Sequence, residues 1–205
     1  MSDIEEITQV IMRERQGRDR GWWSQMADTL LPDATLRLSW IDGTGPEFVE
    51  GSRKMAADNP GSGAVHMIAT PAVRVRDDRA VADVELTIQT RPVLGDVEVN
   101  MTTHLRLVYR MERRGGRWGI YRMDAVDEFD SMTPAIPGQT APVDASALKG
   151  RRPSYRLLSY LLEQRGISVP DDLYGIDRPQ EVVALYRSAF AWAKIDHPDL
   201  AAVPA

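Results

Sequence analysis

The chain has 205 residues, no cysteine and a formal net charge of −5 at pH 7. The lack of cysteine excludes disulfides, thiolate catalysis, iron–sulfur clusters and cysteine-bound zinc. The acidic balance argues against nucleic acid as a partner, because phosphate binding requires a basic face.

The N-terminal part of the chain predicts two helices in succession. Ser2 and Glu5 form a capping-box pattern, and apolar residues then recur at helical spacing until the helix fails near Gly17. A second helix should begin after Gly21. Its apolar face comprises Trp23, Ala27, Leu30 and Leu31, and its stop is Pro32-Asp33.

A strand and a third helix should follow. Apolar and polar residues alternate over 35–40, which is typical of a half-buried strand. Ser52 is the expected cap of a short helix at 53–58, and the Pro- and Gly-rich segment 59–63 ends it.

From residue 64 onward the hydrophobic period changes to two. The expected strands cover 65–76, 79–92, 97–112 and 117–129. The turns between them are short, which favours antiparallel neighbours and therefore a meander. Helices followed by strands indicate an α+β fold.

The C-terminal part has a different character. We expect a domain over 1–130, a Pro-rich linker over 131–150 and a helical extension over 151–205. In the extension, Pro153 should start one helix. Asp177 with Gln180 forms a second capping-box pattern before another. Both helices are amphipathic, so they should pack on the main domain or on a partner subunit.

Asp19 and His66 are the leading candidates for chemistry. Asp19 lies where the first helix should end, and His66 opens the first long strand. A histidine titrates near neutral pH and can both take and return a proton. An aspartate bonded to one ring nitrogen fixes the tautomer and stabilises the imidazolium that forms. Each signal alone is weak, since such residues usually cap helices or lie at the surface.

Taken together, the elements resemble the nuclear transport factor 2-like superfamily. Within it they are most similar to the polyketide-cyclase-like (SnoaL-like) and scytalone-dehydratase-like branch. The resemblance covers about residues 3–130 and rests on Asp19 before Trp22-Trp23, Leu31-Pro32-Asp33-Ala34, His66, Asp78-Arg79-Ala80-Val81-Ala82 and Gly115-Gly116-Arg117-Trp118-Gly119-Ile120.

This resemblance implies a cone-shaped, curved antiparallel sheet around a blind apolar cavity, plugged by three N-terminal helices. It also implies a catalytic dyad, because scytalone dehydratase and hexachlorocyclohexane dehydrochlorinase carry Asp and His at the positions of Asp19 and His66. Other positions depart from the dehydratase. Thr90 replaces a second pocket histidine and Arg18 replaces a tyrosine, so scytalone itself is not the expected substrate. A homodimer or homotrimer is a further expectation from the resemblance.

Further residues are candidates for binding the substrate. Tyr109 lies on the apolar face of its strand and would donate a hydrogen bond to a developing oxyanion. Trp40 would stack on an aromatic substrate. Asp124 or Asp127 would close the pocket from the last strand, and Thr90 would line it. His104 falls on the polar face of its strand and should point outward.

The predicted function is a cofactor-independent lyase for a small, hydroxylated, hydrophobic or aromatic molecule, acting by dehydration or retro-aldol C–C cleavage. An isomerase or cyclase, or a non-catalytic ligand-binding module, is the alternative. The three histidines lack metal-ligand spacing, and no nucleotide-binding motif is present, so neither metal nor cofactor is expected. The N-terminus lacks a signal-peptide core, and no apolar run approaches the roughly 20 residues of a membrane helix. We therefore expect a cytoplasmic protein with no membrane partner.

Overall fold

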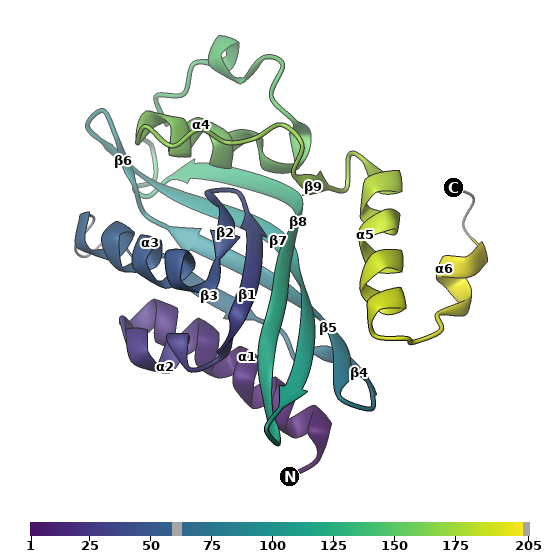
Figure 1. The fold of residues 1–205 in the computed structure, drawn as a ribbon. Helices are drawn as coiled ribbons and strands as arrows, with labels where there is room; N and C mark the ends of the chain where they lie inside the picture. Colours follow the sequence, from purple (N-terminus) through teal and green to yellow (C-terminus); the bar gives the residue numbers. More distant parts are fainter. Residues whose placement is uncertain (59–62, 203–205) are drawn as a thin grey trace.

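Residues 1–58 and 63–202 are described in the structure, a computed structural model of the chain. Nine strands of this part form one curved sheet that does not close. They are β1 (Leu30–Leu38), β2 (Ile41–Thr44), β3 (Val65–Ile68), β4 (Ala72–Arg76), β5 (Arg79–Thr90), β6 (Val93–Leu94), β7 (Val97–Arg114), β8 (Arg117–Pro134) and β9 (Tyr174–Gly175). The main path runs β2–β1–β8–β7–β5–β3 (Figure 1).

Helices lie on both sides of this sheet (Figure 1). They are α1 (Asp3–Arg20), α2 (Trp23–Ala27), α3 (Gly45–Asp58), α4 (Arg156–Gln164), α5 (Pro179–Trp192) and α6 (Pro198–Ala202), with 3-10 turns at Ala145–Leu148 and Pro153–Tyr155. The side of the sheet that carries α1 and α3 is called the inner face below, and the side that carries α5 is the outer face.

The predicted α+β class and the meander are confirmed. β5 pairs antiparallel with β7, and β7 pairs antiparallel with β8 along almost its full length. Two strands add parallel pairs, since β1 and β9 both run parallel to β8. The sheet is therefore mixed at this point, although its long central strands are antiparallel.

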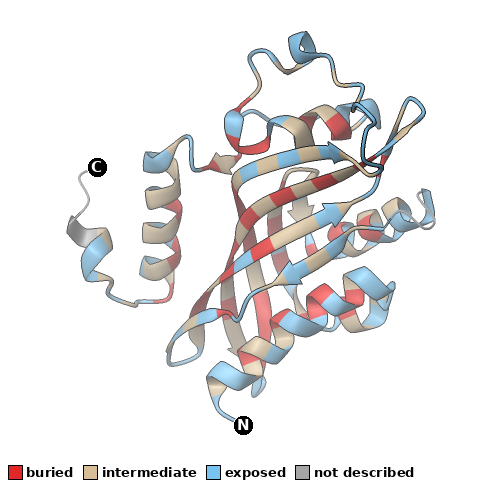
Figure 2. Cartoon of the chain, turned by 180° about the vertical axis from the view of Figure 1, so that it is seen from behind, coloured by how far each residue is buried: buried red, intermediate tan, exposed pale blue. Residues whose placement is uncertain are grey.

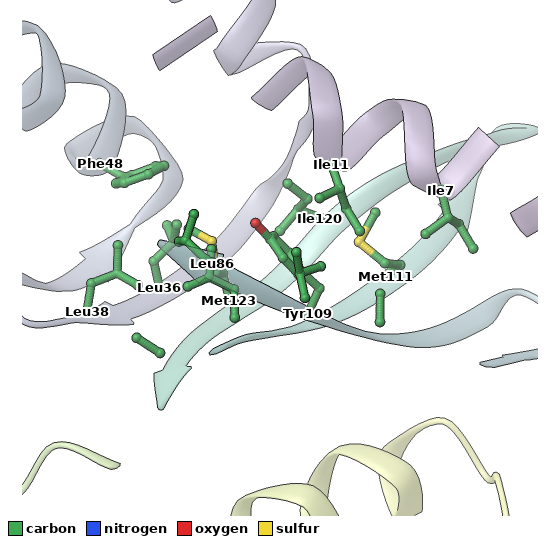
Figure 3. Packing of buried hydrophobic residues seen from close by; sticks show 14 of the residues in the cluster. Ile7, Ile11, Leu36, Leu38, Phe48, Leu86, Tyr109, Met111, Ile120 and Met123 are labelled. Atoms are coloured by element: carbon green, nitrogen blue, oxygen red, sulfur yellow. The ribbon is translucent and has the colours of Figure 1, made fainter. Parts of the chain in front are cut away.

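The main core lies between the inner face and the N-terminal helices. Ile7 and Ile11 of α1 are fully buried and point toward Met111 and Tyr109 of β7 (Figure 3). Burial along β7 alternates with period two, because successive side chains of a strand point to opposite faces. Buried residues recur along α1 at helical spacing, with exposed residues between them, as expected for a helix that lies on a core (Figure 2).

The C-terminal helices pack on the same sheet. Leu185 and Ala189 of α5 are buried against Val108 and Val126 on the outer face. α4 instead lies at the end of β8, where the Asp130 carboxylate accepts hydrogen bonds from the backbone N–H groups of Leu157 and Leu158 at 2.7 and 2.8 Å. A carboxylate in this position satisfies helix N–H groups that have no partner within the helix.

The first helix is longer than predicted. α1 continues through Gly17 to Arg20, so its expected end near Gly17 is wrong. Gly17 is instead a point of close approach, since a Cβ there would lie 3.0 Å from the Cβ of Met26 in α2. The helix ends at Gly21, whose φ of 68° is left-handed, and this places Asp19 in the last turn. The capping box of Ser2 and Glu5 is present as predicted.

The second helix is shorter than predicted, because α2 ends at Ala27 and β1 already begins at Leu30. Pro32 therefore lies within a strand rather than at a helix stop. The register between β1 and β8 shifts between Leu30 and Thr35, and this irregular stretch tolerates a residue without an N–H. Trp40 lies in the turn after β1, outside the strand where the alternation placed it.

The expected cap of the third helix is also wrong. α3 begins at Gly45, and Ser52 lies within it. The hydroxyl of Ser52 donates a hydrogen bond to the carbonyl of Phe48 at 2.7 Å, one helical turn earlier. At the real start, the Glu47 carboxylate accepts from the Thr44 backbone N–H at 2.8 Å. Of the segment predicted to end this helix, residues 59–62 lie outside the described part of the chain.

After residue 63, the observed elements differ from the predicted ones in three places. The expected strand 65–76 is divided into β3 and β4, and β8 extends to Pro134, into the segment predicted as linker. Asp177 is not a helix cap, because the residue that precedes α5 is Arg178. The Asp177 carboxylate instead accepts hydrogen bonds from Arg152 and Ser154, which are distant in sequence.

Replacing Gly21 by Ala should destabilise the protein by about 1–2 kcal/mol, because a side chain disfavours left-handed backbone. Urea unfolding followed by circular dichroism measures the change. Gly63→Ala is the matched control, since a Cβ at Gly63 meets nothing within 4 Å and its φ is not left-handed. Equal stability of both variants would contradict the role of Gly21.

Candidate active site

The structure brings Asp19 and His66 together across 47 residues of sequence. The Nδ1 atom of His66 lies 2.5 Å from Oδ1 of Asp19, and the backbone N–H of His66 donates to Oδ2 at 3.0 Å. Both carboxylate oxygens are thus engaged by one residue. The elements fix this geometry, since Gly21 ends α1 just after Asp19 and β3 holds His66 opposite Ile88 of β5.

The environment of the pair favours a neutral imidazole and a charged carboxylate. The His66 side chain is only 3% exposed. Burial, opposed by the hydrogen bond to Asp19 and supported by Arg15 and Arg18, lowers the pKa of His66 to about 4. Burial works against the charge of Asp19, but the hydrogen bonds from His66 keep the pKa of that carboxyl below its usual value. At neutral pH the ring is therefore able to accept a proton.

His66 lines a cavity of about 150 Å³ between the inner face and the helices. The walls are mostly apolar and come from β1, β5, β7, β8, α1, α3 and α4, with Leu86, Ile88, Met101, Leu105 and Leu107 from the sheet and Leu158, Leu161 and Leu162 from α4. An adjoining hollow of about 160 Å³ contains Asp19 and shares His66 and Thr90 with the cavity. A wider hollow of about 700 Å³ lies beside Arg13 and Trp118 and contains neither residue of the pair.

The sequence of this domain matches a known protein family. The model of the SnoaL-like domain matches residues 1–124, which include both Asp19 and His66. The chain belongs to the SnoaL-like domain family.

One sequence relative and two solved structures are similar to this chain. An uncharacterized protein of Emericella nidulans is 28% identical over 190 residues, covering 85% of this chain and 79% of that protein. The hexachlorocyclohexane dehydrochlorinase LinA-type3 of Novosphingobium barchaimii is 14% identical, with a TM-score of 0.52 over 68% of this chain and 94% of that chain. A putative scytalone dehydratase of Novosphingobium aromaticivorans is 11% identical, with a TM-score of 0.50 over 69% and 93%. At these identities the two structures establish the shared fold.

Three other predicted site residues lie in the wall of this SnoaL-like cavity. They are Trp40, Thr90 and Asp127. Asp127 is 2% exposed, and its Oδ2 atom is buried without a hydrogen-bond partner in the described structure. Burial, reinforced by the nearby Asp130, raises the pKa of Asp127 to about 7. The cavity of the SnoaL-like domain thus contains a carboxyl that holds its proton near neutral pH.

Two predicted residues lie elsewhere in the domain. Tyr109 is fully buried in the core below α1 and is not part of the cavity wall (Figure 3). Burial raises its pKa. Asp124 is also fully buried, but its carboxylate pairs with Arg122 at 2.7 and 2.8 Å, outside the cavity. His104 stacks on Phe129 at 4.3 Å and is likewise absent from the cavity wall, as its strand pattern predicted.

Sequence reasoning missed the three arginines of the cavity wall, Arg15, Arg18 and Arg165. Arg15 and Glu14 form a buried, bidentate ion pair. Burial works against the charge of Arg15, but Glu14 holds its pKa above the usual value. Burial, together with Arg15, lowers the pKa of Arg18 to about 10, so this guanidinium is charged at neutral pH. Their only signal in the sequence was the replacement of a tyrosine by Arg18.

In the described part of the chain, no helix is long and apolar enough to cross a membrane. Within 1–58 and 63–202, no group of three or more His, Cys, Asp or Glu side chains is arranged to hold a metal ion.

Proposed function

We propose that this SnoaL-like domain is a cofactor-independent lyase that removes water from a small, hydroxylated molecule. The observation that supports this most directly is the His66–Asp19 hydrogen bond of 2.5 Å at the wall of an apolar cavity. The fold shared with a dehydrochlorinase and a putative scytalone dehydratase adds support, because both names describe eliminations.

The proposed reaction uses one group that accepts a proton and another that donates one. His66 takes a proton from carbon through Nε2, since Nδ1 is held by Asp19. The electron pair left on carbon forms a double bond as the neighbouring C–O bond breaks. Asp127 donates a proton to the departing oxygen, which leaves as water. The proton on His66 and the one missing from Asp127 are then exchanged with solvent, and the Asp19 carboxylate stabilises the transient imidazolium.

Asp127 favours elimination over the alternatives that share the same base. Environments that push two pKa values apart mark an acid and a base within one site. Here a neutral histidine and a protonated carboxyl line one cavity. Isomerisation and C–C cleavage also use the base, but a departing hydroxyl needs the acid most, because hydroxide is a poor leaving group.

A chromogenic elimination probe tests this proposal without knowledge of the substrate. A β-hydroxy ketone with a phenyl group on its hydroxyl-bearing carbon loses a proton from the carbon next to the carbonyl while the C–O bond breaks. The products are water and a conjugated enone that absorbs near-ultraviolet light. We expect turnover that rises as the pH passes about 4, where His66 loses its proton, and falls as it passes about 7, where Asp127 loses its own. Burial is the main cause of the raised pKa of Asp127. The charges of Asp130 and Asp177 raise it further, and that of Arg152 lowers it.

Asp127→Asn distinguishes the two limbs of the pH profile. The variant should lose the fall near neutral pH and keep the rise near pH 4. A wild-type protein without turnover above the uncatalysed rate would overturn the proposal and leave a non-catalytic binding module. A profile with neither limb would remove these two residues from the reaction.

A further inference from the structure

We propose that the molecule bound in this cavity carries an anionic oxygen group, a carboxylate or a phenolate, that Arg18 receives beside His66. The inference rests on the proposed function for the location of the site. It concerns binding, however, so it is tested without turnover.

The Arg18 side chain lies in the cavity wall and is held there by neighbouring side chains. Its guanidinium carbon lies 5.0 Å from the centre of the Trp40 ring and 5.4 Å from that of Phe48. The same group donates a hydrogen bond to the hydroxyl of Ser52. These contacts hold the planar guanidinium group in one orientation. None of the three partners carries a negative charge that would balance it.

The carboxylates near Arg18 are already engaged. Glu14 is bound by Arg15 through both oxygens, and Asp19 is bound by His66 through both oxygens. No other carboxylate pairs with Arg18 in the described part of the chain. Arg18 is half-buried. Charges withdrawn from water in proteins are normally paired, because desolvation of an isolated ion is costly. An anion supplied by the ligand would provide the missing partner.

The surroundings also define the size and shape of the ligand. A cavity of about 150 Å³ suits a single aromatic ring, since an engineered apolar cavity of that volume binds benzene. Trp40 contributes aromatic surface to the same cavity wall. Guanidinium donors match a carboxylate in a bidentate arrangement. The chain is acidic overall, with a net charge of −5, so the cluster of arginines here is a local feature.

Such an anion would strengthen the base. Arg15 and Arg18 both lower the pKa of His66 through their charges, whereas Asp19 raises it. A negative group bound on Arg18 offsets that effect and raises the pKa of His66 from about 4 toward neutrality. The substrate would thus activate its own proton acceptor on binding.

Calorimetric titration with benzoate and benzamide at pH 7 tests the inference. The two probes share ring and shape, but only benzoate is charged. We expect wild-type protein to bind benzoate at least about tenfold more tightly, which is the effect of one charge-assisted hydrogen-bonded pair. Arg18→Gln should abolish this preference, and Arg18→Lys should restore part of it.

Arg20→Gln is the matched control, because Arg20 lies in the same last turn of α1 as Arg18 but does not line the cavity. It should leave the preference intact. A preference that survives Arg18→Gln, or one that Arg20→Gln removes, would overturn the assignment to Arg18. Equal binding of both probes to the wild type would refute an anionic ligand altogether.

A second measurement needs no variant. Benzoate, unlike benzamide, should raise the pH at which the His66 imidazole titrates in NMR spectra of the wild type. An unchanged titration would contradict the inference. Loss of probe elimination in a His66 variant, with no benzoate preference, would leave the proposed function standing while this inference falls.

Discussion

Replacing His66 by Gln is expected to lower the rate of cofactor-free elimination by about 10²–10⁴-fold, the usual worth of positioned proton transfer. Glutamine retains a polar group that can bond Asp19, but it cannot accept a proton. Initial rates with the β-hydroxy ketone probe, measured near pH 6 between the two limbs, report the loss. The affinity for benzamide should stay close to that of the wild type, since the walls of the cavity are unchanged.

His104→Gln supplies the matched control for this experiment. It makes the same chemical change at a histidine outside the cavity, where the ring stacks on Phe129 and lies within hydrogen-bond distance of Thr87. Its rate should equal that of the wild type. If both variants lost activity equally, or if His66→Gln kept the full rate, His66 would not be the proton acceptor.

The largest expected effect on stability comes from Glu14→Gln. Glu14 is 0% exposed and pairs with the buried Arg15. Removing the carboxylate leaves an uncompensated buried cation, which costs about 3–5 kcal/mol. Urea unfolding followed by tryptophan fluorescence gives the change in the free energy of unfolding.

Two further variants separate the charge effect from other causes. Glu50→Gln makes the same substitution in the exposed pair of Glu50 with Arg53, where the cost should be below about 1 kcal/mol. The double variant Glu14→Gln/Arg15→Met should be more stable than Glu14→Gln, because it also removes the stranded charge. A double variant less stable than the single one would contradict this explanation.

The sequence predicted the features that depend on local pattern. The capping box at Ser2, the period-two strands with their short turns and the later helices are of this kind. The pairing of Asp19 with His66 is different, because 47 residues separate them. Only the resemblance to a known fold brought these two residues together, and the structure gives them a direct hydrogen bond.

Features that depend on tertiary partners could not be predicted. Pro32 reads as a helix stop, yet its strand is fixed by β8, which lies far along the chain. Asp177 has the spacing of a cap, but Arg152 takes its carboxylate. Glu14 and Arg15 are consecutive residues of an ordinary amphipathic helix. Their burial arises only because α1 lies across the inner face, and no spacing rule indicates it.

The origin of α4 has a consequence for how such proteins diversify. The SnoaL-like match ends at residue 124, so it includes His66 and Asp19, whereas Asp127 and the leucines of α4 that line the cavity come later in the chain. Exchange of the segment from α4 onward between homologues would therefore change the apolar wall of the cavity and leave His66, Asp19 and Asp127 in place.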